Sequence, residues 1–371
     1  MHDIYISGTG HWKAQHLVTN EEIVSSFNEY VRLYNIEHEE EILKGSKEAL
    51  GPSSVEFIEK ASGIKTRYLI DKQNCLDINV MKPILSPENP GKISILAEMS
   101  IHAAKEALDQ AGIQAKDVDA VILGTSHISR NYPAIACEVM DELGIEGYGY
   151  DMLIGCSSTT FAISNAYSDI ASGLADTILV INPELTSPHN DFTLRDSHFI
   201  FGDACVATVV QKDSTSKNRA RILDRKLVTQ FSNNIRSDFG YLNRVEEPPK
   251  DKKDLFFKQN GKGVFKEVCP MVASLVTDQL SRLDIPVSDI SQFWLHQANA
   301  NMCRVIMTRI LGTSDYDPDM APMILSEFGN VASAGSVLSY HLNNNLQKGD
   351  KGIICSFGAG YSICSLVIER A

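Results

Sequence analysis

An internal repeat restricts the possible folds of this 371-residue chain more than any other feature of its sequence. Residues 108–123 align without a gap on residues 280–295, and in both copies the end of a helix, a polar turn and an apolar strand follow one another. A second pair repeats at nearly the same spacing, because Gly155-Cys156 opens one predicted helix and Gly329-Asn330 opens another. Such self-similarity indicates a duplicated unit, so we expect two β/α halves that pack back to back.

The repeat and the hydrophobic pattern together locate the main elements. Apolar positions at helical spacing predict a helix that includes Leu96 and Ala111, and short apolar runs predict strands buried on both faces. The helix after Cys156 should stop at Gly173, and the helix after Asn330 should continue to Gly349. The expected strands cover residues 120–123, 152–154, 177–181, 293–295 and 352–356. We expect the strand at 177–181 to lie at a sheet edge, where it needs a neighbouring strand from a second copy of the chain.

A polar segment at residues 211–220 marks the expected boundary between the halves. We therefore predict an N-terminal half at residues 1–215 and a C-terminal half at residues 216–371. Three further segments have no counterpart in the repeat, and we expect them to form caps over one face, where binding functions usually lie. These segments cover roughly residues 25–92, 183–200 and 226–262.

The composition excludes several classes of protein. A formal net charge of −13 would repel nucleic acid over most of the surface. No apolar stretch is long enough to span a membrane and the first residues do not resemble a signal peptide, so we expect a cytoplasmic protein without membrane insertion. The eight cysteines include no C-x-x-C pair, which predicts reduced thiols and no bound metal. The early Gly8-Thr9-Gly10 lacks the remaining features of a dinucleotide site, and we expect no cofactor there.

Cys156 is the strongest candidate nucleophile. It follows a predicted strand and Gly155 and directly precedes a helix, so its sulfur should lie at a helix N-terminus. Unpaired amides and the helix dipole at such a position favour thiolate over thiol. The other seven cysteines lack this setting, and we interpret them as structural residues.

Two further residues are predicted to lie near Cys156. His296 ends a buried strand, and the carboxyl ends of strands are where open α/β sheets place their ligands. Asn330 is the repeat-equivalent of Cys156, so the internal symmetry should bring it to a matching helix start, although asparagine is also a common helix N-cap. The glycine-rich segment Gly358-Ala359-Gly360 would let backbone amides approach a ligand closely.

Together these residues resemble the thiolase-fold ketosynthases, and among them β-ketoacyl-acyl-carrier-protein synthase III. The resemblance covers nearly the whole chain, and its motifs occur in the family's order and spacing. They are Gly155-Cys-Ser157, Val264-Phe-Lys266, His296-Gln-Ala-Asn299, Phe328-Gly-Asn-Val-Ala-Ser333 and Phe357-Gly-Ala-Gly360. The resemblance implies an α/β thiolase fold, in which the two duplicated halves form a five-layer αβαβα sandwich with inserted cap segments.

The resemblance also implies an acyltransferase of fatty-acid biosynthesis that works without a cofactor. Cys156 would take an acyl primer from a thioester, with the oxyanion held by its own amide and by one from Gly358, Ala359 or Gly360. Malonyl bound to acyl carrier protein would then lose carbon dioxide, and His296 and Asn330 would stabilise the enolate. Attack on the Cys156 thioester would release a β-ketoacyl product. Asn299 and Phe357 are expected to bind substrate.

Several positions depart from the family's usual pattern. Phe57 and Ala61-Ser62 replace the Trp and Arg-Thr that typically hold the adenine of coenzyme A, and Asn301 replaces an Arg. Longer caps predict a primer of medium or greater length, delivered as acyl-CoA or acyl carrier protein. Tyr132 lies in the segment that resembles the loop closing the primer pocket across the interface of a homodimer.

The acyl carrier protein is acidic, and a local basic patch must therefore offset the negative charge of this chain. Lys258, Lys262 and Lys266 occur at a spacing of four residues, and Lys266 is the preferred candidate for carrier binding. A solvated lysine-rich loop is the alternative interpretation.

Three other functions share some of these features. A ketosynthase III-like enzyme of secondary metabolism, making a resorcinol, pyrone or aryl polyene, would have the same three residues. A papain-like thiol hydrolase would have Cys, His and Asn in the same order, but not at symmetry-equivalent ends of duplicated units. A non-catalytic partner subunit would normally have lost one of the three.

Overall fold

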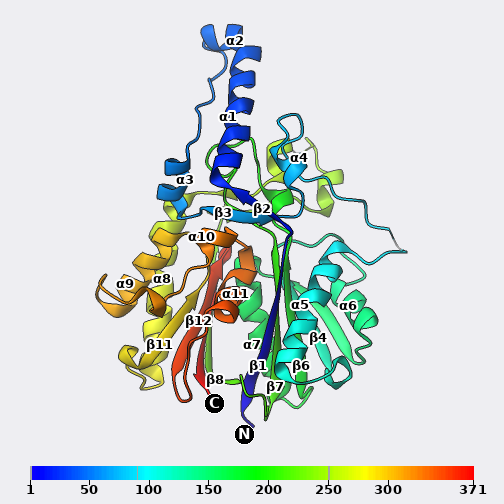
Figure 1. The fold of residues 1–371 in the computed structure, drawn as a ribbon, viewed down its shortest axis with the longest axis vertical. Coiled ribbons are helices and arrows are strands. Elements are labelled where there is room, and N and C mark those ends of the chain that lie inside the picture. The colour runs from blue at the N-terminus through cyan, green and yellow to red at the C-terminus, as the bar shows by residue number, and fades with distance from the viewer. Residues whose placement is uncertain (1, 90, 250) are drawn as a thin grey trace.

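The computed structural model describes residues 2–89, 91–249 and 251–371. Nine of its strands form one continuous sheet, whose two parts, called here the N-terminal and the C-terminal sheet, meet along one short seam (Figure 1), and the pairs β2–β3 and β9–β10 form two small separate sheets. The continuous strand order is β11-β12-β13-β8-β1-β7-β6-β4-β5. At the seam, β1 pairs with β8 only through Tyr5 and Ile6. The N-terminal sheet consists of β1 (Ile4–Lys13), β4 (Ala120–Thr125), β5 (Tyr148–Leu153), β6 (Thr177–Glu184) and β7 (Ala204–Lys212). The C-terminal sheet consists of β8 (Ala220–Ser232), β11 (Ile290–Leu295), β12 (Lys351–Gly358) and β13 (Gly360–Arg370).

The two sheets have the same internal order, which confirms the duplication. In the N-terminal sheet, β1, β7, β6 and β4 follow one another outward from the seam, and β8, β13, β12 and β11 do so in the C-terminal sheet. The pairs β6–β7 and β12–β13 are antiparallel, whereas the pairs β4–β6 and β11–β12 are parallel. β5 pairs with β4 and has no counterpart in the second sheet. The predicted boundary falls in the turn between β7 and β8.

Helices fill three layers around the sheets, so the five-layer arrangement is confirmed. The middle layer holds α7 (Ser158–Ala171) and α11 (Gly335–Leu342), whose apolar residues form one core with strands of both sheets. The outer layers hold α5 (Ile95–Ala111) and α6 (Ile135–Leu143) on one side, and α8 (Gly261–Arg282) and α9 (Ala300–Leu311) on the other. Small residues suit a helix covered on both sides, and Ala162 and Ala166 of α7 are fully buried.

Further elements form a cap over one end of the sandwich, with α1 and α2 extending away from it (Figure 1). A separate core joins this cap to the body through residues such as Ile58, Phe199 and Leu325. The cap elements are β2 (His16–Thr19), α1 (Asn20–Glu37), α2 (Glu39–Leu43), α3 (Val55–Ser62), β3 (Thr66–Leu69), α4 (Lys72–Leu76), β9 (Ile235–Arg236), β10 (Lys258–Gln259) and α10 (Leu325–Phe328). The expected insertion at 226–262 begins inside β8, so only its later part belongs to the cap.

Two expectations about single elements are wrong. The helix after Asn330 was expected to reach Gly349, but α11 ends at Leu342 because the following Asn343-Asn344-Asn345 run favours non-helical backbone. The strand at 177–181 was expected at a sheet edge, but β6 lies between β4 and β7. The free edge of the N-terminal sheet is β5.

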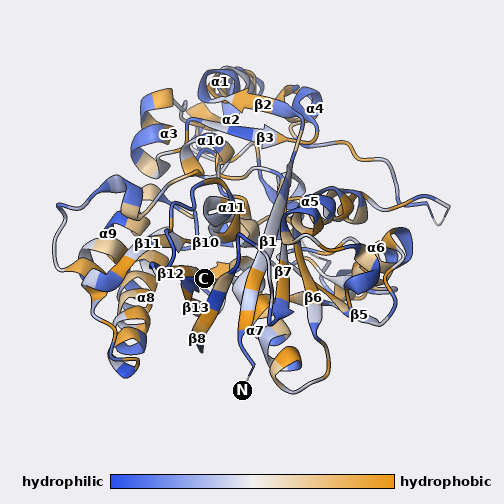
Figure 2. Cartoon of the chain, turned by 60° about the horizontal axis from the view of Figure 1, so that its bottom comes forward, coloured by the Kyte–Doolittle hydropathy of each residue, from blue (hydrophilic) through white to orange (hydrophobic). Residues whose placement is uncertain are grey.

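Hydropathy follows this layered plan. Strands β6 and β7 carry long hydrophobic stretches, whereas hydrophilic residues collect on the outer surfaces of the helices (Figure 2). Among the residues that the structure describes, no helix combines the length and the apolar character needed to cross a bilayer.

Candidate active site

Cys156 lies in a short 3-10 turn, η2 (Gly155–Ser157), between β5 and α7. The backbone enters this turn through Gly155, whose φ of +56° favours glycine. The turn is fixed on both sides, because Ser157 Oγ donates to Ser362 O at 2.6 Å and Ser158 Oγ donates to Thr125 O at 3.0 Å. These bonds hold the thiol at the meeting point of the two halves.

One cavity of about 260 Å³ brings the predicted catalytic residues together. Cys156, His296 and Asn330 all line it, as do Asn299 and Phe357. The remaining walls come largely from the cap and from the first turns of α8, which contribute Ala61, Ser62, Phe199, Phe257, Gly261, Val264 and Phe265. The cavity therefore opens where the unrepeated segments cover the sandwich, as expected for a binding site.

The glycine-rich turn between β12 and β13 packs directly on the cysteine. A Cβ atom at Gly358 would lie 2.7 Å from Cys156 Cβ and 3.2 Å from its backbone nitrogen, so only glycine fits. Ala359 approaches from the same side, since a Cβ at Gly155 would lie 3.4 Å from Ala359 Cβ. The turn ends at Gly360, where β13 begins. This close approach supplies backbone amides near the sulfur.

The electrostatic environment of Cys156 differs from the expectation. Burial raises the pKa of the thiol to about 12, and the nearby Glu184 carboxylate acts in the same direction. Cys156 lies one residue before Ser157, the N-cap of α7, so it stands at the start of the helix as predicted. Burial and the helix N-terminus therefore act on this thiol in opposite directions, and the raised pKa favours the thiol in the free enzyme.

His296 follows β11 directly and is buried. Its backbone N–H donates to Cys355 O at 2.8 Å, and its ring meets Phe357 edge-on with 5.2 Å between centroids. Burial lowers the pKa of the imidazole to about 4, so His296 is neutral at pH 7. Within the described part of the chain, His296 Nδ1 has no hydrogen-bond partner. A neutral ring can offer a hydrogen bond to a developing anion.

Asn330 precedes a second 3-10 turn, η8 (Ala332–Ala334), which corresponds to η2 in the repeat. Its Oδ1 accepts a hydrogen bond from the Ala332 N–H at 3.0 Å, which leaves the Nδ2 amino group as the donor toward a ligand. Thr159 Oγ1, in the first turn of α7, donates to Ser333 O at 2.5 Å and joins this helix to η8. The internal symmetry thus explains why Asn330 and Cys156 share a cavity.

Sequence reasoning missed Glu184, which is fully buried at the end of β6. Its carboxylate accepts hydrogen bonds from the backbone N–H and hydroxyl of Ser126 and from those of Ser333. Burial raises the pKa of Glu184 to about 7, and these four donors act against that rise. An acidic residue at the end of an otherwise apolar strand was the signal that could have found it.

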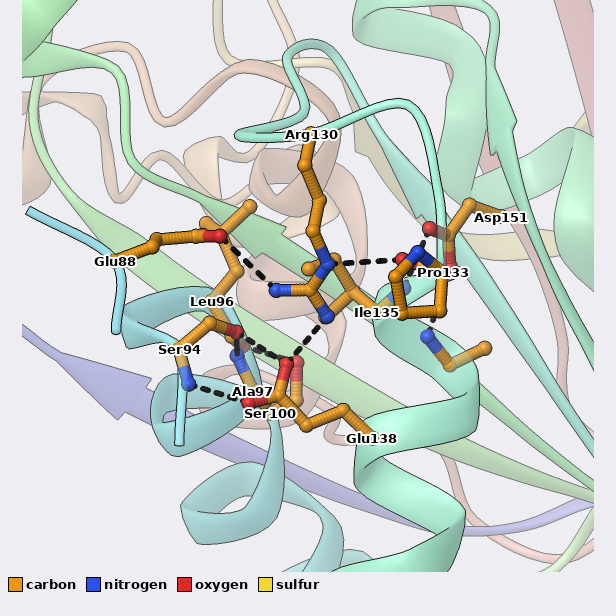
Figure 3. Close-up of polar contacts among 11 residues, drawn as sticks. Glu88, Ser94, Leu96, Ala97, Ser100, Arg130, Pro133, Ile135, Glu138 and Asp151 are labelled. Atoms are coloured by element: carbon orange, nitrogen blue, oxygen red, sulfur yellow. Dashed lines mark hydrogen bonds and ion pairs between the residues drawn. The ribbon is translucent and has the colours of Figure 1, made fainter. Parts of the chain in front are cut away.

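Tyr132 is placed away from this cavity. Its side chain is 84% exposed in the loop between β4 and α6. Figure 3 shows how this loop is held, with Arg130 pointing at Glu88 and Glu138. Arg130 Nε also donates to Pro133 O at 2.9 Å. The surface position of Tyr132 suits a residue that acts on a neighbouring chain, and that role stays a prediction.

The three lysines do not form one helical row. Lys258 lies in β10 and pairs with Asp238 at 3.2 Å and with Asp254. Lys262 and Lys266 lie in the first two turns of α8, are exposed, and flank the cavity residues Val264 and Phe265. Lys262 and Lys266 therefore lie together on α8 next to the cavity, whereas Lys258 forms ion pairs with its carboxylate partners.

Asn299 lines the cavity but its amide has structural partners. The side chain caps α9 by accepting from the Asn301 and Met302 N–H groups, and Nδ2 donates to Ala61 O at 2.7 Å. Asn301 Nδ2 likewise donates to Lys60 O at 3.3 Å. These two bonds tie α9 to the end of α3 at the cavity wall.

A duplicated five-layer fold with Cys, His and Asn around one cavity defines the class of thiolase-fold condensing enzymes. The comparisons agree with this class. Residues 150–230 match the model of the family 3-oxoacyl-[acyl-carrier-protein (ACP)] synthase III, and residues 280–370 match the model of its C-terminal domain. The crystal structure of 3-oxoacyl-[acyl-carrier-protein] synthase III from Aquifex aeolicus VF5 superposes with a TM-score of 0.76 at 20% identity, covering 99% of both chains.

Two curated relatives give the same assignment. The beta-ketodecanoyl-[acyl-carrier-protein] synthase of Pseudomonas aeruginosa is 49% identical over 350 residues, which cover 94% of this chain and 100% of the relative. The beta-ketoacyl-[acyl-carrier-protein] synthase III of Helicobacter hepaticus is 29% identical over 326 residues, covering 85% of this chain and 89% of the relative. The chain belongs to the 3-oxoacyl-[acyl-carrier-protein] synthase III family. It is a condensing acyltransferase with a thiolase fold, and the papain-like alternative is wrong.

Proposed function

We propose that this enzyme condenses a medium-chain acyl primer, carried as a thioester on Cys156, with malonyl bound to acyl carrier protein. The observation that carries the proposal is the single cavity that presents the Cys156 thiol beside two neutral hydrogen-bond donors, His296 and Asn330. These donors suit a negative charge that exists only during decarboxylation. The name of the Pseudomonas relative supports a primer of medium length.

The first half-reaction forms the Cys156 thioester. The Cys156 sulfur attacks the primer carbonyl, the carbonyl oxygen becomes an oxyanion, and the departing thiol leaves with a proton. The amides of Cys156 and of the Gly358–Gly360 turn are the proposed oxyanion donors, because this turn contacts the cysteine. A thiol with a raised pKa must lose its proton as the bond forms, which ties acylation to pH.

The second half-reaction forms the carbon–carbon bond. Malonyl loses carbon dioxide, and His296 and Asn330 donate hydrogen bonds to the enolate oxygen. The enolate carbon attacks the Cys156 thioester, the carbon–sulfur bond breaks, and the cysteine is regenerated with the β-ketoacyl product on the carrier protein. The protein groups alone provide this chemistry, so the proposal includes no cofactor.

A second cavity offers room for the primer chain. It has a volume of about 460 Å³, and its largely apolar wall includes Leu85, Ile93, Leu96, Ile128 and Leu185. In the chain, Ile128 of this wall lies three residues after Thr125. The Thr125 carbonyl accepts a hydrogen bond from the hydroxyl of Ser158, which is two residues after the proposed nucleophile Cys156. We therefore place the tail of a medium-chain primer here, beside the loop that carries Tyr132.

Mass spectrometry of the acyl group trapped on Cys156 tests the proposal. The enzyme is incubated with a mixed panel of acyl thioesters from acetyl to dodecanoyl, offered on coenzyme A and on carrier protein in separate arms. Trapping of medium chains supports the proposal, and Cys156→Ala should trap none. Trapping of acetyl alone, or of label on another cysteine, contradicts it.

A cavity-filling variant tests where the chain lies. Ile128→Trp should shift the trapped chains toward acetyl, because the indole occupies the proposed space. Leu174→Trp is the matched control, since Leu174 is exposed beyond the end of α7. An unchanged chain-length profile for Ile128→Trp would place the primer elsewhere.

The product separates this function from the secondary-metabolite alternative. A fatty-acid enzyme releases a β-ketoacyl chain on carrier protein after one condensation with malonyl, whereas the alternative joins two acyl chains or cyclises the product. We further propose that the enzyme acts as a homodimer in the cytoplasm, where the acidic carrier protein docks beside Lys266.

A further inference from the structure

The seam between the two sheets leaves one strand edge open. β1 pairs with β7 as far as Lys13, but its pairing with β8 ends after Ile6. Side chains of α5 satisfy the exposed backbone: the Thr9 N–H donates to Gln110 Oε1 at 2.7 Å, and the His11 N–H donates to Glu106 Oε2 at 2.8 Å. The carboxylate of Glu106 is thereby fixed at the seam.

The Gly8-Thr9-Gly10 segment explains why α5 can come so close. A Cβ atom at Gly10 would lie 2.2 Å from Ala103 O and 2.8 Å from Glu106 Cβ, and a Cβ at Gly8 would lie 2.3 Å from Ala107 O. Only glycine permits this contact between strand and helix. Gly8 and Gly10, for which the sequence predicts no cofactor role, thus allow α5 to bring Glu106 beside β1.

His341 reaches the same point from α11, which belongs to the C-terminal half. His11 Nδ1 lies 3.1 Å from His341 Nε2 and 3.1 Å from Glu106 Oε2, and His341 Nε2 lies 3.3 Å from Glu106 Oε1. Three ligand atoms, one from each residue, therefore all lie within 4.8 Å of one another. Two imidazoles and one carboxylate converge where β1, α5 and α11 meet.

The other ring nitrogen of His341 has a polar partner outside the cluster. Thr9 Oγ1 lies 2.9 Å from His341 Nδ1, and Gln110 Oε1 accepts from the Thr9 N–H and the Thr9 hydroxyl. When the Thr9 hydroxyl donates to Gln110, it accepts from His341 Nδ1–H, and the Nε2 lone pair of His341 points into the cluster. Metal sites commonly hold the second ring nitrogen of a histidine ligand in this way.

The spacing of these atoms suits a tetrahedral metal ion. Ligand atoms about 2.0–2.1 Å from zinc at tetrahedral angles lie about 3.3–3.4 Å apart. The two ring nitrogens are 3.1 Å apart, and each lies near a different oxygen of Glu106, at 3.1 Å for His11 and 3.3 Å for His341. Imidazole and carboxylate are both ligands that zinc accepts, and three protein ligands leave a fourth position for water.

We propose that His11, Glu106 and His341 form a Zn²⁺ site that clamps the N-terminal half to the C-terminal half. The side chains are 26%, 44% and 8% exposed, respectively, so the ion can enter from the Glu106 side. None of the three lines the cavity that contains Cys156. The site therefore lies outside the cavity that contains Cys156, and its existence does not depend on the function proposed above.

Zinc binding to the reduced full-length protein tests this proposal by isothermal titration calorimetry. The wild type should bind one equivalent per chain and show a melting temperature that rises with Zn²⁺. His11→Gln and Glu106→Gln should each weaken binding at least tenfold and lose the thermal shift. His16→Gln is the matched control, because His16 is an exposed histidine on β2, and it should bind as the wild type does.

Cobalt distinguishes this site from the thiols. Co²⁺ added to the wild type should give visible d–d absorption without a thiolate-to-cobalt charge-transfer band, and His11→Gln should lose that absorption. Equal zinc binding by the wild type, His11→Gln and Glu106→Gln would overturn the proposal. So would a charge-transfer band that reports cysteine ligands, or an absence of binding, which would leave the cluster holding a shared proton only.

Discussion

The charge state of Cys156 decides how the first half-reaction begins. A helix N-terminus and a buried site act on a thiol in opposite directions, and desolvation by burial is the larger effect on the pKa of Cys156. In the proposed mechanism the amides near the sulfur would stabilise charge on the substrate oxygen more than charge on the free thiol. They would then favour the transition state over the resting enzyme.

Alkylation of Cys156 should therefore depend steeply on pH. With the pKa of the thiol raised to about 12, the thiolate fraction is small at pH 7 and grows about tenfold for each pH unit. The rate of carbamidomethylation by iodoacetamide, followed at Cys156 by mass spectrometry, should rise about tenfold from pH 7 to pH 8. Glu184→Gln removes a nearby negative charge and should speed the reaction at each pH. A rate that is already constant between pH 7 and pH 8 would show a thiolate instead.

His296 and Asn330 should matter chiefly for decarboxylation. Both are placed to donate to an enolate, and loss of one such donor typically costs about 10²–10³ in rate. His296→Ala and Asn330→Ala should each still acquire acyl label on Cys156 but release carbon dioxide from malonyl carrier protein at least about 10²-fold more slowly. Mass spectrometry measures the first step and ¹⁴CO₂ release the second. Intact decarboxylation together with lost acylation would reverse the assigned roles.

At the scale of elements, α8 connects the active site to the surface. Its first turns contribute Val264 to the cavity wall, and Lys262 and Lys266 project from the same turns into solvent. The helix thus provides positive charge at the mouth of a protein whose net charge is −13. A positive patch at this position can attract an acidic partner despite long-range repulsion.

Lys266→Glu should raise the apparent KM for malonyl carrier protein several-fold and leave acylation of Cys156 from a small thioester unchanged. Added salt should weaken the wild type more than the variant, because it screens an attraction that only the wild type has. Lys226→Glu, on β8, is the matched control for the change in net charge. Equal KM values and equal salt sensitivity would move the docking surface away from α8.

Much of this architecture could be predicted because the repeat is visible in the sequence. The equivalence of Cys156 and Asn330 located two turns that pack against each other, and the strand end before His296 located the third residue. What could not be predicted depends on contacts between distant segments. The donors around Glu184 come from Ser126, just after β4, and from η8, and the pairing of β6 with β4 and β7 has no local signal. The spacing of Lys258 from Lys262 and Lys266 likewise gave no sign of its ion pairs with Asp238 and Asp254.

At the scale of the whole molecule, the two halves depend on each other around the active site. Cys156 comes from one half and His296 and Asn330 from the other. Hydrogen bonds that Ser157 and Thr159 donate, and one that Glu184 accepts from Ser333, cross between the halves near them. The proposed zinc clamp would join the halves again at the seam. Relative movement of the halves would separate the proposed nucleophile from its proposed donors, so both sets of contacts would preserve one geometry.

The open edge of β5 is the place where a second copy of the chain should bind. β5 is paired on one side only, and an unpaired strand edge readily accepts another strand. A twofold axis at this edge would pair β5 with its own copy and extend the N-terminal sheet across the dimer. The axis would also bring the exposed Tyr132 loop of one protomer near the other.

We therefore expect a homodimer in solution that depends on β5 rather than on β6. Light scattering at micromolar concentration should give about twice the monomer mass of 40.9 kDa. Leu153, at the end of β5, is 53% exposed, and Leu153→Asp should shift the mass toward the monomer because it adds a charge to the interface. Leu174→Asp places the same charge on another exposed leucine outside this edge and should remain dimeric. A monomeric wild type, or equal behaviour of the two variants, would exclude this edge as the interface.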